Sequence, residues 1–115
     1  MLGRNHYEQD YIDRSRERIG AQLAAYDALK AKAKGADAEI AAFEPLFLND
    51  LVQVLDHLFV HRLRKMEGKD GNPLNEVRAL CDSLMSNGDE VRLDEDGFRR
   101  LSDGFFAEIE SRFGG

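Results

Sequence analysis

The sequence has one cysteine, Cys81, no tryptophan, and no apolar run approaching the length of a membrane-spanning helix. A single cysteine excludes an internal disulfide and is typical of a reducing compartment. The opening stretch, MLGRNHYEQDYIDRSRER, is polar and charged and lacks the apolar segment of a secretory signal. These absences predict a cytoplasmic protein that no membrane segment anchors.

Basic residues are outnumbered, with 16 lysines and arginines against 22 aspartates and glutamates, which gives a net charge of −6. Phosphate contacts need a basic surface, so this balance disfavours nucleic-acid binding as the main activity. Apolar residues make up 43% of the chain and charged residues 33%, a balance that suits a folded helical protein and not a disordered one. A length of 115 residues predicts a single helical domain over 1–115.

Apolar spacing predicts a first helix after a flexible arm over residues 1–9. Asn5 with Glu8, or Asp10 with Asp13, is expected to cap this helix, and Gly35 is expected to end it. Its predicted apolar face comprises Ile12, Ile19, Leu23, Tyr26, Leu29 and Ala33.

The second helical segment is predicted to be interrupted at a proline. Asp37 can cap a short segment, and Pro45 is expected to kink or break the helix near Phe43 and then to open a long central helix that turns basic at its end. The apolar face of that central helix is predicted to comprise Phe47, Leu51, Val54, Leu55, Leu58, Phe59 and Met66.

A glycine-rich loop, Gly68-Lys69-Asp70-Gly71-Asn72-Pro73, separates the central helix from the next one. Gly71 permits a positive φ, Asn72 can cap, and Pro73 fits the first helical position. The next helix is predicted to stop at Asn87, a minor β connector is possible over residues 90–93, and Asp94 is expected to cap the last helix. The fold class predicted is all-α, an antiparallel four-helix bundle.

His57 and His61 are four residues apart, which on a helix places both imidazoles on one face. Asp50 lies on the same stripe two turns earlier, so the three residues are a candidate metal site. The alternative interpretation is a pair of surface histidines hydrogen-bonded to carboxylates, because this spacing often arises by chance.

Basic residues gather where the start of the first helix and the end of the central helix are expected to meet. The candidate anion-binding residues at this basic pole are Arg62, Arg64, Lys69, Asp70 and Asn72. Arg62 itself falls inside the predicted apolar face, so it either extends to the surface or pairs with Glu67, Asp70 or Glu76. Dipole compensation at a helix end is the competing explanation for the cluster.

Two other patterns are not interpreted as sites. The stretch Asp94–Phe98 resembles a calcium loop but places Arg92 where a carboxylate is required. Cys81 lies in an apolar stripe and is expected to be a buried hydrophobe.

Phe106 and Val60 lie off the main apolar faces, which indicates either a homodimer that covers them or burial of a helix on more than one side.

The stretch from Phe43 to Met85, FEPLFLNDLVQVLDHLFVHRLRKMEGKDGNPLNEVRALCDSLM, resembles a group of small bacterial proteins that carry no assigned activity. A weaker likeness covers LSDGFFAEIESRF near the end of the chain. The resemblance implies a helical fold and no particular function, and in the similar proteins the connector near residues 87–93 is longer.

The function predicted is a non-enzymatic helical module that acts through protein contacts as a homodimer. The alternative is a protein that binds a metal or a small anion through His57 and His61 or through the basic pole. The sequence does not identify a cofactor.

Overall fold

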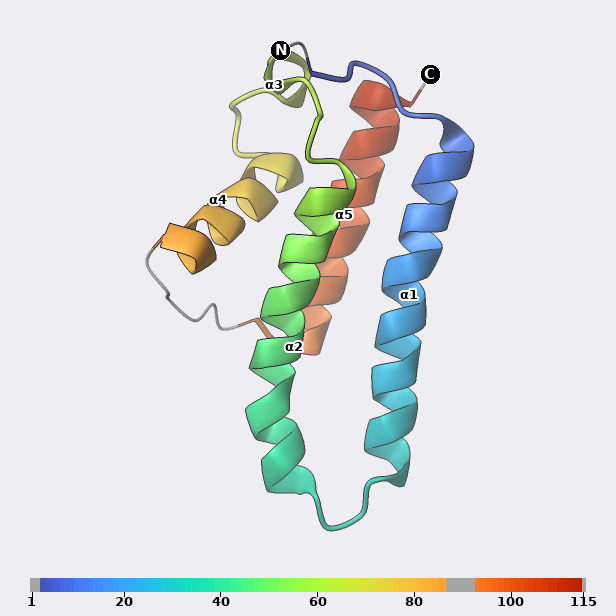
Figure 1. Ribbon diagram of the computed structural model, residues 1–115, viewed down its shortest axis with the longest axis vertical. Helices are drawn as coiled ribbons and strands as arrows, with labels where there is room; N and C mark the ends of the chain where they lie inside the picture. The colour runs from blue at the N-terminus through green and yellow to red at the C-terminus, as the bar shows by residue number, and fades with distance from the viewer. Residues whose placement is uncertain (1–2, 87–92, 115) are drawn as a thin grey trace.

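The computed structural model describes residues 3–86 and 93–114, and within these ranges the protein is all-helical (Figure 1). An isolated bridge pairs Arg4 with Arg62, and the described ranges contain no strand. The helices are α1 (Gln9–Lys32), α2 (Asp37–Leu58), α3 (Arg64–Glu67), α4 (Pro73–Ser86) and α5 (Glu95–Phe113).

Three long helices form the body of the molecule. Helix α1 runs antiparallel to both α2 and α5, so α2 and α5 run in the same direction (Figure 1). The shorter α4 packs obliquely on α2 and α5, and α3 packs on α5. The all-α class is confirmed, but the antiparallel four-helix bundle is not confirmed in this detail.

The core lies between the long helices and is rich in phenylalanine. Phe59, fully buried, stands at its centre, with ring centroids 4.9 Å from Tyr7, 5.4 Å from Tyr11, 5.8 Å from Phe105 and 6.0 Å from Phe106. Edge-on ring packing of this kind adds to the gain from apolar burial. Phe106 is therefore covered by its own chain and needs no partner.

Helix α2 contains Pro45 and continues through it, so the helix does not break near Phe43, and the expected kink is not confirmed. The helix instead ends at Leu58, several residues before the predicted end. Arg62 explains this end, because its guanidinium folds back and donates to the carbonyl of Phe59 at 3.0 Å and to that of Asp56 at 3.5 Å. Carbonyls at a helix end lack intrahelical partners, and a basic side chain can satisfy them.

The structure confirms the local predictions at two helix starts. Asn72 caps α4 by accepting a hydrogen bond from the Leu74 amide at 2.8 Å, and Gly71 has a φ of 79°. Asp94 caps α5 by accepting from the Gly97 amide at 2.7 Å. In contrast, the residues preceding α1 and α2, Glu8 and Ala36, make no side-chain cap.

Two further predictions concern the ends of elements. The proposed β connector over 90–93 lies outside the described residues apart from position 93. The described part of the predicted arm, residues 3–8, is bound to the turn after α2 and to the end of α5 by backbone hydrogen bonds.

None of the helices within the described ranges combines the length and apolarity that crossing a membrane requires.

Pro45→Ala is expected to raise the free energy of unfolding by about 1–3 kcal/mol, since alanine restores a helical hydrogen bond and removes a clash with the preceding turn. Chemical denaturation measures the change. The exposed Ala42→Gly is the matched control and is expected to lower stability by about 1 kcal/mol. A destabilised Pro45→Ala protein would contradict an α2 helix that continues through this position.

Candidate functional site

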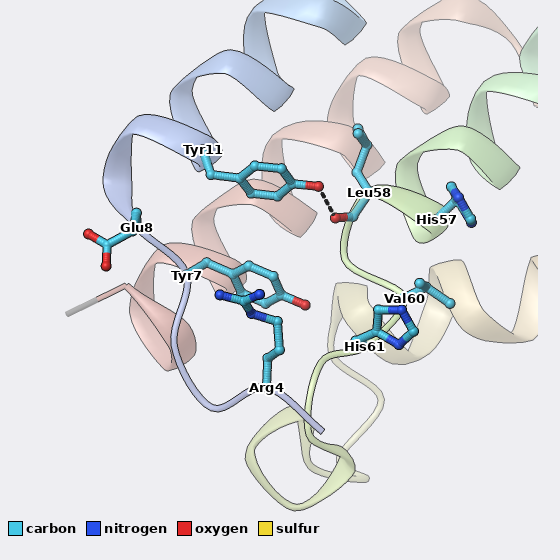
Figure 2. Close-up of a pocket in the computed structure, with 8 residues that line it drawn as sticks. All are labelled: Arg4, Tyr7, Glu8, Tyr11, His57, Leu58, Val60 and His61. Carbon is cyan, nitrogen blue, oxygen red and sulfur yellow. Dashed lines mark hydrogen bonds between the residues drawn. The ribbon is translucent and has the colours of Figure 1, made fainter. Parts of the chain in front are cut away.

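A pocket of about 330 Å³ opens between the start of α1 and the end of α2 (Figure 2). It combines cationic, aromatic and aliphatic side chains with two imidazoles. The residues that line it are Arg4, Tyr7, Glu8, Tyr11, His57, Leu58, Val60 and His61.

The segment before α1 positions one wall of this pocket. The Arg4 amide donates to the His61 carbonyl at 2.6 Å, and the Leu63 amide donates to the Arg4 carbonyl at 2.7 Å. The Tyr7 amide donates to the carbonyl of Phe113 at 2.8 Å, which ties the segment to the end of α5. Backbone hydrogen bonds to the turn after α2 and to the end of α5 therefore hold this wall in place.

Tyr7 and Tyr11 differ in what their hydroxyls contact. The Tyr11 hydroxyl donates at 2.5 Å to the carbonyl of Leu58, the last residue of α2 (Figure 2). The Tyr7 hydroxyl is buried and has no protein partner. Burial raises the pKa of Tyr7 above its usual 10.0 in spite of the nearby charges of Arg4 and Arg62. The hydroxyl is therefore protonated at neutral pH and can donate.

The structure does not form the predicted metal site. His57 lies in the last turn of α2, but His61 lies in the turn beyond it, so the helical spacing that was to align their imidazoles does not apply. In the ranges that the structure describes, no three histidine, cysteine, aspartate or glutamate side chains are grouped to hold a metal ion. Asp50 is exposed on α2, two turns before His57, and does not line the pocket.

Arg62, the first of the predicted anion-binding residues, is fully buried and already neutralised. Its guanidinium donates to Glu67 through Nε at 2.8 Å and to Asp56 through Nη2 at 2.8 Å. It also reaches the Leu74 carbonyl at 3.5 Å and lies 5.5 Å from the centre of the Phe105 ring. The expectation that Arg62 pairs with Glu67 holds, and the surface-reaching alternative is wrong.

Glu67 joins three segments at the basic pole. Arg78 of α4 donates to both of its oxygens, at 2.5 and 3.1 Å, and Asn75 donates to Oε2 at 2.9 Å. Burial alone raises the pKa of the Glu67 carboxyl, but hydrogen bonds from Arg78 and Asn75 and the charge of Arg62 outweigh it, so the pKa lies below the usual 4.5. Glu67 is therefore ionised at neutral pH inside the protein.

The other predicted anion-binding residues have separate places. Asn72 is buried and donates to the Glu67 carbonyl and to Asp70, and Asp70 also contacts Arg112. Arg64 and Lys69 are exposed and do come together, in a second pocket of about 370 Å³ that Arg78 and Asp82 also line. Anion binding at the basic pole therefore depends on Arg64 and Lys69, and it stays a prediction.

Sequence reasoning missed Arg4, Tyr7 and Tyr11. Tyr7 and Tyr11 have the four-residue spacing of one helical face, but the predicted arm placed Tyr7 outside the core. Cys81 was predicted correctly as buried. Burial raises the pKa of its thiol to about 12, so the sulfur is protonated and a poor nucleophile.

A second surface lies at the far end of the long helices, where α1 and α2 are joined. Leu29 of α1 is 55% exposed, and Phe43 and Leu46 of α2 are 46% and 59% exposed. A groove of about 260 Å³ runs beside them, and Tyr26 and Phe47 form its apolar floor. We call Tyr26, Leu29, Phe43, Leu46 and Phe47 the apolar patch.

Comparison with protein-family models, with curated proteins and with solved structures gives no match to this chain. The resemblance of residues 43–85 to small bacterial proteins therefore stays a prediction.

Glu67→Gln is expected to lower the free energy of unfolding at pH 7 by about 3 kcal/mol, because it removes the buried carboxylate shared by Arg62 and Arg78 and leaves Asp56 to pair with Arg62. Since folding depresses the pKa of Glu67, its stabilisation is present above pH 4.5 and is lost as the pH falls through the lowered value. The difference between the two proteins should therefore shrink at acid pH.

Denaturant titrations at pH 7 and at successively lower pH measure that difference. Asp10→Asn is the matched control, because Asp10 forms an exposed ion pair with Arg14 and its loss is expected to cost less than about 1 kcal/mol. An equal effect of the two substitutions would show that the buried pair contributes no more than a surface pair.

Proposed function

We propose that the protein is a non-enzymatic helical module that acts through protein contacts, and that it binds a second copy of itself through the apolar patch. The observation that supports this most directly is the joint exposure of Leu29, Phe43 and Leu46 on neighbouring turns of two helices. Single exposed apolar residues are ordinary, whereas a contiguous group of them marks a binding surface.

The patch has the construction of a protein interface. Phe43 and Phe47 stack with ring centroids 5.6 Å apart, and both contact the ring of Tyr26 on α1. Rings that are already packed lose little conformational freedom when a partner covers them. The aromatic centre is bordered by Lys30, whose ammonium pairs with Glu95 of α5 at 2.5 Å.

The charges at this end favour a second copy as the partner. The exposed Lys32 ends α1, beyond the Lys30 that already pairs with Glu95, and the first turn of α2 carries Asp37 and Glu39. A two-fold axis through the patch would set the basic turn of each chain against the acidic turn of the other. Two-fold interfaces use the same surface on both chains, so complementary charges on one surface satisfy that symmetry.

Leu46→Glu is expected to convert a dimer into a monomer, since it places a charge on the apolar patch that the second copy would cover. Sedimentation equilibrium of the unmodified protein should give twice the chain mass of 13.0 kDa, and the variant should give that mass once. Helix content by circular dichroism should stay the same because Leu46 is 59% exposed.

Met85→Glu on α4 is the control, because Met85 is 73% exposed and lies outside the apolar patch. This substitution should leave the dimer intact. A monomeric unmodified protein at millimolar concentration, or a dimer that persists in Leu46→Glu, would refute self-association through this surface.

A further inference from the structure

The side chain of Arg4 lines the pocket between α1 and α2 and carries a positive charge. Among the described residues, no carboxylate forms an ion pair with Arg4, whose guanidinium lies 5.3 Å from the centre of the Tyr7 ring. Two backbone hydrogen bonds, to His61 and from Leu63, fix the main chain of Arg4. A guanidinium held at the mouth of a pocket is suited to binding a carboxylate or a phosphate.

The wall beneath that cation contains a donor without a partner. Tyr7 is 5% exposed, lines the pocket, and its hydroxyl makes no hydrogen bond within the protein. Figure 2 shows this hydroxyl directed toward the side of the pocket where Leu58, Val60 and His61 lie. An unpaired buried hydroxyl is unfavourable, and an acceptor on a bound molecule would remove that cost.

Part of the remaining wall is apolar and flat, and the imidazoles of His57 and His61 complete the lining. The rings of Tyr7 and Tyr11 are nearly parallel, with centroids 5.9 Å apart and planes 18° apart, and Leu58 and Val60 add aliphatic surface. Glu8 is the one acid in the lining; it pairs with His6 at 3.5 Å, and Figure 2 shows its carboxylate directed away from Tyr7 and His61.

From this arrangement we propose that the pocket binds a small organic monoanion, a carboxylate attached to a flat apolar body. Arg4 binds the carboxylate of the ligand, and the Tyr7 hydroxyl donates a hydrogen bond to the same carboxylate. Tyr11, Leu58 and Val60 contact the apolar body of the ligand. One free guanidinium balances one negative charge, and Glu8 at the rim disfavours a dianion. The proposal is independent of self-association, because the apolar patch lies at the opposite end of α1 and α2.

Benzoate is the probe, added to the ¹⁵N-labelled full chain while amide chemical shifts are recorded. We expect saturable shifts of amides around the pocket, with a dissociation constant of about 1 mM. Arg4→Gln, which removes the charge but keeps an unbranched polar side chain, should weaken binding about tenfold.

Tyr7→Phe is the second variant, and it separates binding from folding. It keeps the ring and removes a hydroxyl that has no partner, so the melting temperature should be unchanged or higher, while benzoate binding weakens about fivefold. Arg18→Gln on the exposed side of α1 removes the same charge away from the pocket and should leave binding unchanged.

The outcomes are distinct from those of the self-association experiment. Absence of saturable shifts with benzoate, or equal binding by Arg4→Gln and Arg18→Gln, would overturn the proposal. Inorganic phosphate that displaces benzoate at equal concentration would also overturn it, because an anion without an apolar body would then suffice.

Discussion

The ion pair between Arg62 and Glu67 is the interaction on which the rest of the structure depends. Both charged groups are removed from water, so each needs its partners: Arg62 pairs with Glu67 and Asp56, and Glu67 pairs with Arg62 and Arg78. Arg62 satisfies the carbonyls that end α2, and Glu67 receives Arg78 and Asn75 from α4. One pair of charges thus stabilises the end of α2 and the turn after it, and joins that turn to α4.

The turn that this pair stabilises also creates the pocket. Because α2 ends at Leu58, the following residues leave the helix and expose a backbone edge, and the segment before α1 binds to that edge through Arg4. Tyr7 is then packed against Phe59 and Phe113 and becomes one wall of the pocket. A longer α2 would remove that edge. The candidate ligand site is therefore a consequence of a polar interaction in the interior.

Local chemistry explains which parts of the fold were predictable. Apolar periodicity gave the all-α class, and short polar side chains before helical stretches gave the caps at Asn72 and Asp94. The break expected at Pro45 does not occur, because the tendency of proline to interrupt a helix is local. Burial of Leu48, Leu51 and their neighbours stabilises α2 on both sides of Pro45. The spacing of His57 and His61 suggested a metal site. A four-residue spacing aligns two side chains only when both lie in one helix, and His61 lies beyond the end of α2.

The sequence by itself determined the helical class, the Gly68–Pro73 loop, the burial of Cys81 and the meeting of the start of α1 with the end of α2. Only the tertiary structure decided that α2 and α5 run in the same direction, that Arg62 is an internal residue, and that Arg4 and Tyr7 line a pocket with His57 and His61. The physical reason is the range of the interactions. Periodicity, caps and turns act between residues a few positions apart, whereas the pocket and the buried pair depend on contacts between segments that the sequence does not place together.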